Sequence, residues 1–250
     1  MTSVWKTPPP DLKLSPDHID VWHVPLGPPM RINKYRALLS REELGRSERF
    51  KSEKRRREFT VCRGLLRLLI AQCLDTDPSA LEFAYTKHQK PYLPTAPLDM
   101  QVSFNITHSH NLALIALTLE RMIGVDLEYI RNNVEFRKLA KRFFSNQESR
   151  ALDACDDTLL PAAFFACWTR KEAFVKALGD GIVFGLGDFT VSVDPWDRAV
   201  ALHTGGEVNV PGDWSIISLE TGRDYAAAVA ANGGRFKLRL WKGMGSGLES

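Results

Sequence analysis

The chain has 250 residues, of which 44% are hydrophobic and 25% charged, and its formal net charge is +3. Because this charge is small and no apolar run approaches the ~18 residues of a membrane span, we expect neither a nucleic-acid nor a membrane partner. Residues 1–10 are polar and proline-rich without the apolar core of a secretion signal, and the four cysteines show no C-x-x-C pair or zinc-ligand spacing, so we expect a cytoplasmic protein without disulfides.

The first half of the chain alternates between strand and helix patterns. Alternating apolar residues predict a strand at 19–24, and residues 40–43 (SREE) have the form of a capping box that opens a short helix carrying Arg46 and Arg49. Apolar residues at helical spacing then predict a long helix at 53–74. Further strands are expected at 81–85, 102–106 and 112–117.

One face of the predicted helix at 53–74 is basic. Arg56, Arg63 and Arg67 form a stripe about a quarter turn from the apolar face, and no acidic residue lies within this stripe of the helix surface. A charged stripe is usually a solvated helix face, but without interspersed acids this one also fits a polyanionic ligand, since the guanidinium group pairs well with phosphate. Gly64, beside Arg63, could let such a ligand approach.

Two stretches of the second half carry the acidic residues of interest. Residues 123–128 (IGVDLE) alternate as in a strand, so Asp126 and Glu128 project from one face beside a glycine that leaves room. In the helix predicted at 161–178, Glu172 lies at the edge of the apolar stripe and Lys176 follows one turn later. A carboxylate there needs a partner, either Lys176 or a metal ion, and two adjacent carboxylates repel unless a cation separates them. Three such side chains with water and a substrate phosphate would form a normal Mg²⁺ site.

The order of elements predicts the architecture. A helix is expected at 135–143 and strands at 189–193, 200–202, 214–219, 225–230 and 236–241. Both halves then run from a strand through a short and a long helix to several strands, which predicts an α+β (α/β) fold of two similar lobes, each a small, mainly antiparallel sheet packed on a long helix. We expect an N-terminal lobe at 1–118, a C-terminal lobe at 119–241 and a loose tail at 242–250. The arginines and the acids would then face one cleft between the lobes.

His108 stands where a predicted strand gives way to a turn, in the stretch Thr107-His108-Ser109-His110. A histidine in this position is often only a turn residue or a hydrogen-bonded rim group. His108 and His110 could also be a metal pair, but no third histidine or cysteine stands near them in the sequence, which disfavours zinc.

Three stretches carry the most specific pattern: residues 104–109 (FNITHS), 123–128 (IGVDLE) and 168–176 (WTRKEAFVK). In order and spacing they resemble the Sfp-type 4′-phosphopantetheinyl transferases, and Gln89-Lys90-Pro91 resembles that family's G-K-P turn with glutamine replacing glycine. The resemblance covers roughly residues 43–230. It implies a pseudo-symmetric (pseudo-twofold) monomer that uses Mg²⁺ to move the 4′-phosphopantetheine arm of coenzyme A onto a serine of an apo acyl or peptidyl carrier protein, releasing 3′,5′-ADP.

Matching positions imply roles for individual residues. The resemblance implies metal ligation by Asp126, Glu128 and Glu172, and contact of Lys176 with the pyrophosphate and the leaving group. It implies contacts with the coenzyme A phosphates by Arg46, Lys90 and His108, together with Thr107, which keeps the hydroxyl of the family's usual serine. Glu148 matches the position proposed in some members to take the proton from the carrier serine. Arg63 has no firm family role and is a further hypothesis for a phosphate contact.

Two other functions are consistent with parts of the sequence. A metal-dependent phosphohydrolase or nuclease would also use carboxylates with basic residues. A coenzyme A or polyanion binding module without chemistry is a second alternative, and the intact acidic residues and Lys176 argue against it. The sequence does not say whether the carrier would belong to fatty acid, polyketide or nonribosomal peptide synthesis.

Overall fold

The computed structural model describes residues 5–27, 32–87, 90–94, 101–179, 185–200, 202–204 and 212–243. The first half contains β1 (His18–Pro25), α1 (Ile32–Arg36), α2 (Arg41–Glu48), α3 (Glu53–Leu74), the short 3-10 helix η1 (Pro78–Ala80), β2 (Ala84–Tyr85), β3 (Pro91–Tyr92), β4 (Val102–Ser109) and β5 (Leu112–Leu119). The second half contains β6 (Ile123–Tyr129), α4 (Phe136–Phe143), α5 (Asn146–Asp153), α6 (Leu160–Leu178), β7 (Phe189–Thr190), β8 (Ala199–Val200), β9 (His203–Thr204), β10 (Trp214–Ser218), β11 (Tyr225–Asn232) and β12 (Lys237–Lys242).

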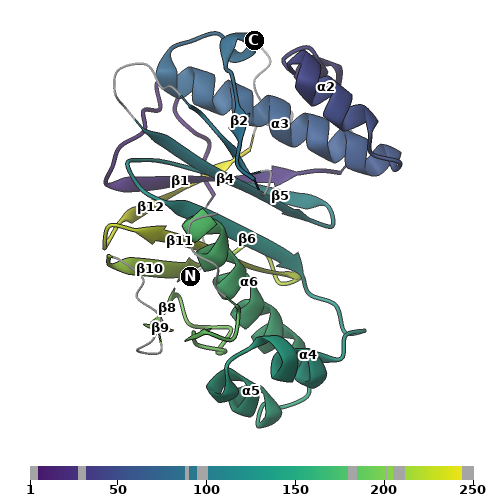
Figure 1. The fold of residues 1–250 in the computed structure, drawn as a ribbon, viewed down its shortest axis with the longest axis vertical. Helices are drawn as coiled ribbons and strands as arrows, with labels where there is room; N and C mark the ends of the chain where they lie inside the picture. The colour runs from purple at the N-terminus through teal and green to yellow at the C-terminus, as the bar shows by residue number, and fades with distance from the viewer. Residues whose placement is uncertain are drawn as a thin grey trace.

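Two four-stranded sheets form the centre of the molecule, with strand orders β12-β1-β5-β4 and β6-β11-β10-β8. Their pairs are antiparallel except β1 with β12, which is parallel. Helix α3 lies over the first sheet and α6 lies against the second, with α4 and α5 at the far end of α6 (Figure 1). The predicted α+β class with small, mainly antiparallel sheets and long helices is confirmed, while the twofold relation between the lobes stays a prediction.

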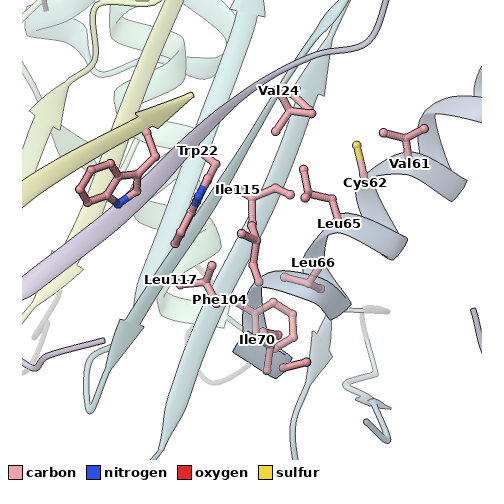
Figure 2. Packing of buried hydrophobic residues seen from close by; sticks show 14 of the residues in the cluster. Trp22, Val24, Val61, Cys62, Leu65, Leu66, Ile70, Phe104, Ile115 and Leu117 are labelled. Carbon is pink, nitrogen blue, oxygen red and sulfur yellow. The ribbon is translucent and has the colours of Figure 1, made fainter. Parts of the chain in front are cut away.

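Alternation along the strands divides the apolar residues among three cores. In the first sheet, one face packs on α3 through residues such as Trp22, Ile115, Leu66 and Ile70 (Figure 2). The second sheet packs on α6 through a separate cluster. The remaining faces of the two sheets pack on each other through a third cluster. The lobes therefore share a buried core and are not independently packed domains.

The last strand requires a correction to the predicted lobes. The expected C-terminal lobe at 119–241 included β12, but this strand runs parallel to β1 in the first sheet. The reason is a buried acid on β1: Asp20 accepts hydrogen bonds from the Arg239 guanidinium at 2.8 and 2.6 Å and from the Trp241 indole at 2.6 Å. Of the predicted tail, Lys242 is the last residue of β12, and 244–250 lie outside the described residues.

The predicted helices have the expected positions, with two additions. Helix α3 spans the predicted 53–74, and Ser40 and Glu43 form the expected capping box at the start of α2. Helices α1 and α5 were not predicted, although Ser145 and Glu148 form a second capping box that opens α5. All four cysteines are free, as expected. Within the described ranges, no helix combines the length and apolar character required to cross a membrane.

Candidate active site

Strand β6 and helix α6 bring the predicted acidic residues into one region. Because side chains alternate along β6, Asp126 and Glu128 lie on the opposite face from the apolar residues that fill the core between the sheets. On α6, Glu172 and Lys176 are one turn apart, and Nζ of Lys176 lies 2.5 Å from Oδ1 of Asp126. The strand and the helix thus place three carboxylates and one ammonium group in the same region.

Gly124 sets the distance between β6 and α6. A Cβ atom at this position would lie 2.0 Å from the carbonyl oxygen of Ala173 and 2.4 Å from the amide nitrogen of Ala177, closer than these atoms can approach. The backbone of α6 therefore lies directly on the strand. The room that the glycine was expected to leave is occupied by the helix that carries Glu172 and Lys176.

The acidic residues share one electrostatic environment. Burial raises the pKa of Glu172, Asp126 raises it further, and Lys176 opposes this increase. Burial is also the main cause that raises the pKa of Glu128, followed by the charge of Asp126. Three acids against one lysine leave an excess of negative charge in a partly buried place, and such an arrangement favours the binding of a cation.

The donor atoms fit a hard divalent cation. Oδ2 of Asp126 is buried and has no hydrogen-bond partner among the described residues. Carboxylate oxygens are the ligands that Mg²⁺ prefers. In the part of the chain that the structure describes, no three histidine, cysteine or acidic side chains meet at one point as a metal site would require. Binding a metal ion would therefore need a rearrangement of side chains around Asp126.

Alternate polar residues of β4 support this region from the first lobe. The Asn105 side-chain oxygen accepts a hydrogen bond from the amide of Val125 at 2.8 Å. Thr107 Oγ1 donates to Oδ1 of Asp126 at 3.3 Å, and Ser109 Oγ donates to Oε2 of Glu128 at 3.0 Å. In this structure Thr107 contacts an acid, so its predicted phosphate contact stays a prediction. The roles of Asn105 and Ser109 were missed, although the every-second-residue spacing of residues 105, 107 and 109 indicated a common face.

Lys90 connects the first lobe to the end of α6. Its Nζ donates to the carbonyl oxygen of Lys176 at 2.5 Å and to that of Ile123 at 3.5 Å. A cation is favourable at the C-terminal turn of a helix because the last carbonyl groups carry partial negative charge. Lys90 therefore stabilises α6 beside the acidic residues. Gln89, which precedes it in the predicted turn, lies outside the described residues.

His108 lies within electrostatic reach of the same region. Its Nε2 is 3.9 Å from Oε2 of Glu58 on α3. Partial burial lowers the pKa of His108, Glu58 opposes this effect, and Lys176 adds to it. His108 and Lys90 of the first lobe thus both interact with Lys176 of the second lobe, whereas the cleft between the lobes stays a prediction.

Comparisons with known proteins give the family. A family model described as 4′-phosphopantetheinyl transferase superfamily matches residues 122–230, and one described as 4′-phosphopantetheinyl transferase, N-terminal, matches residues 29–120. The 4′-phosphopantetheinyl transferase HetI of Nostoc sp. is 35% identical over 95% of this chain and 97% of its own length. This chain belongs to the 4′-phosphopantetheinyl transferase superfamily. The Bacillus subtilis 4′-phosphopantetheinyl transferase Sfp is also similar, with 28% identity over 79% of this chain and 84% of its own.

The predicted family and enzyme class are therefore confirmed: the protein is a phosphopantetheinyl transferase. A cavity of about 1030 Å³ in the transferase lies elsewhere, under the N-terminal half of α6, where Trp5, Arg170 and Trp196 are among the lining residues. None of the predicted site residues lines this cavity. The assignment of the active site rests on the side chains of β6 and α6 instead.

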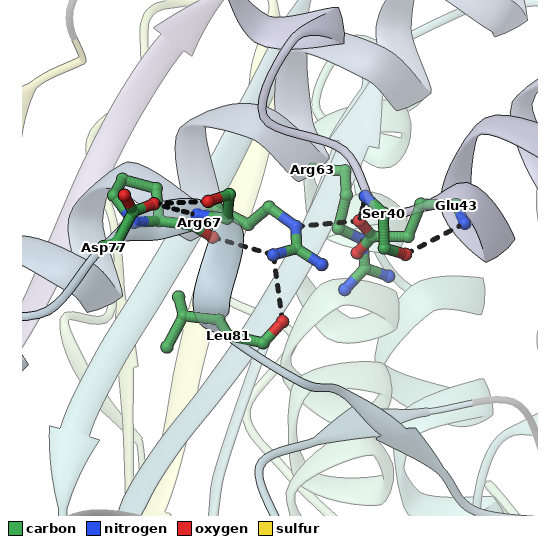
Figure 3. A network of polar contacts seen from close by, with 8 residues as sticks. Ser40, Glu43, Arg63, Arg67, Asp77 and Leu81 are labelled. Atoms are coloured by element: carbon green, nitrogen blue, oxygen red, sulfur yellow. Dashed lines mark hydrogen bonds and ion pairs between the residues drawn. The ribbon is translucent and has the colours of Figure 1, made fainter.

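Part of the basic stripe on α3 of the transferase is buried and faces neither solvent nor a ligand. Arg67 is 1% exposed, and its Nε donates to Oε2 of Glu43 at 2.7 Å (Figure 3). Its Nη1 donates to the carbonyl oxygens of Pro78 and Leu81 at 2.7 and 2.9 Å. The expectation of a common polyanion-binding stripe is wrong for Arg67. The acid that pairs with it lies 24 residues earlier, on another helix.

Arg63 is also buried, and Gly64 has a different role from the one expected. Nε of Arg63 lies 3.4 Å from Oε1 of Glu43. A Cβ atom on Gly64 would lie 2.6 Å from Cβ of Tyr35, so this glycine lets α1 pack on α3, and the expectation that it admits a ligand is wrong. The role of Arg63 as a phosphate contact stays a prediction.

Replacing Arg67 separates the two interpretations of the stripe. Arg67→Ala leaves Glu43 buried with fewer partners, so we expect the free energy of unfolding to fall by about 3–5 kcal/mol. Exposed Arg56 is the control, and Arg56→Ala should change the free energy of unfolding by no more than about 0.5 kcal/mol. Urea unfolding measures both variants, and equal small effects would contradict a structural role for Arg67.

Glu148 does not belong to the candidate active site. It is 1% exposed, and its Oε1 accepts a hydrogen bond from the amide of Val191 at 2.8 Å and lies 2.7 Å from Nζ of Lys171. Its Oε2 accepts from the amide of Ser145 at 2.8 Å. Because both oxygens are buried and engaged, the predicted removal of the serine proton by Glu148 does not fit this structure. The S-x-x-E pattern at 145–148 was the sequence signal for its capping role.

Proposed function

We propose that this transferase uses Mg²⁺ to move the 4′-phosphopantetheine group of coenzyme A onto a serine of an apo acyl or peptidyl carrier protein, acting as a monomer and releasing 3′,5′-ADP. The observation that carries the proposal is the electrostatic interaction of Glu172 with Asp126, Glu128 and Lys176, together with one buried Asp126 oxygen that has no partner among the described residues. Membership in the superfamily supports the reaction class.

The residues divide the task according to their chemistry. Asp126, Glu128 and Glu172 would hold the metal ion, which supplies positive charge next to the pyrophosphate when bound. Lys176 would move from Asp126 to the pyrophosphate oxygens and stabilise the charge that develops on the leaving group. Thr107 keeps Asp126 in place through its hydroxyl group. Phosphoryl transfer requires mainly positioning and positive charge, and this region offers both.

A second group of charges would bind the nucleotide end of coenzyme A. The guanidinium groups of Arg46 and Arg63 lie 5.2 and 5.9 Å from the centre of the Tyr85 ring. Glu43 serves both Arg63 and Arg67, so three arginines in this cluster face one acid. Nη1 of Arg63 is buried without a hydrogen-bond partner in the described part of the chain. An excess of positive charge and an unused donor favour a phosphate group there, with Lys90 and His108 contacting other phosphates.

Arg46→Ala tests this cluster. Loss of a charge-assisted contact should raise the KM for coenzyme A by about 10- to 100-fold, whereas the KM for 3′-dephospho-coenzyme A should change much less. Steady-state kinetics with both substrates measure the difference, and Arg56→Ala is the matched surface control. An equal change for both substrates would remove Arg46 from the 3′-phosphate.

Mass spectrometry tests the reaction as a whole. The protein is incubated with coenzyme A, Mg²⁺ and a panel of apo carrier proteins, and the carriers are weighed afterwards. We expect one phosphopantetheine group on the carrier serine and none when a chelator removes the metal ion. A metal-dependent phosphohydrolase, the main alternative, would release products from coenzyme A and leave every carrier unmodified.

A further inference from the structure

A buried ion pair lies on a different side of α6 from Glu172 and Lys176. Lys171 is 0% exposed, and its Nζ lies 2.7 Å from Oε1 of Glu148 and donates a hydrogen bond to the carbonyl oxygen of Phe189. The same ammonium group lies 4.0 Å from the centre of the Phe189 ring. Lys171 thus connects α6 to the start of α5 and to β7.

The position of Lys171 in the helix fixes the direction of the site residues. Successive helical residues are about 100° apart, so Lys171 projects about 100° away from its neighbour Glu172 and about 140° away from Lys176. A side chain held by fixed partners prevents rotation of the helix about its axis. On the strand side, the contact of Gly124 with the backbone of α6 sets the distance. One contact therefore fixes the rotation of α6 and the other fixes its separation from β6.

The first lobe contains a similar arrangement without the metal-binding acids. There Glu43 belongs to the capping box of α2 and pairs with Arg67 of the long helix α3, as Glu148 belongs to the capping box of α5 and pairs with Lys171 of the long helix α6. In both lobes a buried glutamate joins the start of a short helix to a long helix. Because the same arrangement occurs in the lobe that lacks the metal-binding acids, it indicates a structural role for Glu148 and not the role of a general base.

We propose that Glu148 and Lys171 are positioning residues, which hold the rotation of α6 so that Glu172 and Lys176 face Asp126. The inference rests on the proposed function of those residues. In this proposal Glu148 transfers no proton. Activity requires that the buried pair as a whole is neutral and keeps its shape, and it does not require the carboxylate itself.

The test compares two single variants with their combination. Glu148→Gln and Lys171→Met each leave one buried charge without its partner, whereas the double variant removes both charges and keeps similar volumes. Each protein is first checked for folding by circular dichroism and for coenzyme A binding by calorimetry. Then kcat and KM for coenzyme A are measured over a range of pH with an apo carrier protein.

We expect each single variant to lower kcat by roughly 10²-fold, because small displacements of catalytic groups have effects of this size, while the KM for coenzyme A stays nearly unchanged. The double variant should recover most of kcat and show the pH profile of the unmodified protein. Glu43→Gln, which disturbs the equivalent pair on the helix that also carries Arg46, should change KM and not kcat.

Two results would overturn the inference. A folded double variant that binds coenzyme A but is as inactive as Glu148→Gln would mean that the carboxylate itself reacts. A double variant that does not fold would mean that neutrality and shape cannot replace the pair. Glu172→Gln in the same assay tests the proposed function independently of the pair. Turnover by that variant would refute the metal assignment, and the results for the Glu148 and Lys171 variants would still show whether the pair positions α6.

Discussion

Glu172→Gln is expected to abolish transfer while leaving coenzyme A binding largely intact. The substitution keeps the size of the side chain but removes the charge of one of the three carboxylates of the site, which include the buried Asp126. Loss of a metal ligand removes the positive charge that stabilises the pyrophosphate, so we expect kcat to fall by roughly 10²–10³-fold or more. Product analysis by mass spectrometry gives kcat, and calorimetry gives the affinity for coenzyme A.

The matched control is an acid in the same lobe that is exposed. The side chain of Glu135 is 75% exposed and forms a surface ion pair with Lys138 at 3.0 Å, which contributes little to stability, so Glu135→Gln should keep full activity. A direct titration with Mg²⁺ should also show weaker binding to the Glu172 variant than to the control. Should the Glu172 variant turn over at the normal rate, the assignment of the metal ligands would be wrong.

Gly124→Ala is expected to disrupt both stability and activity. The new methyl group would overlap with the backbone of α6, 2.0 Å from the carbonyl oxygen of Ala173, and neither backbone segment can move freely. We expect the free energy of unfolding to fall by about 3 kcal/mol or more. The displacement of α6 should carry Glu172 and Lys176 away from Asp126, so the folded fraction should also lose transfer activity, by roughly 10²-fold for a shift near 1 Å.

Two other glycines separate these effects. Gly45 lies within α2 with nothing within 4 Å of a Cβ atom, so Gly45→Ala should be neutral or stabilise the protein by up to about 1 kcal/mol. Gly64→Ala would press on Tyr35 in the first lobe, so it should destabilise the protein but leave kcat per folded molecule unchanged. Urea unfolding and kcat are measured for all three variants. If Gly64→Ala lost kcat as Gly124→Ala does, the specific link between Gly124 and the site would fail.

The sequence predicted the local structure of the site well. Alternation in residues 123–128 placed Asp126 and Glu128 on one face, and helical spacing placed Glu172 and Lys176 one turn apart. Both patterns are local, because strand alternation and helical spacing depend only on residues within a few positions of each other. The same reasoning could have found α5 from the S-x-x-E pattern at 145–148.

The partners of buried charges could not be predicted in this way. In the sequence, Arg67 and Glu148 could not be distinguished from exposed or catalytic residues. Only the packing of α2 on α3 and of α5 beside α6 showed that each is buried in an ion pair. A buried charge is stable only with a partner, and that partner can lie anywhere in the chain. Asp20 is the extreme case, since its partner Arg239 lies 219 residues away.

The sequence by itself therefore determined the two long helices and most of the strands, which acids share a face and which superfamily the chain resembles. Only the tertiary structure decided that β12 pairs with β1 in the first sheet, that α6 packs directly on Gly124, and that Glu148 is buried in an ion pair with Lys171. The physical reason is that hydrophobic periodicity shows which side of a helix or strand is buried. The close contact of two backbones and the pairing of buried charges depend on which other element packs against that side.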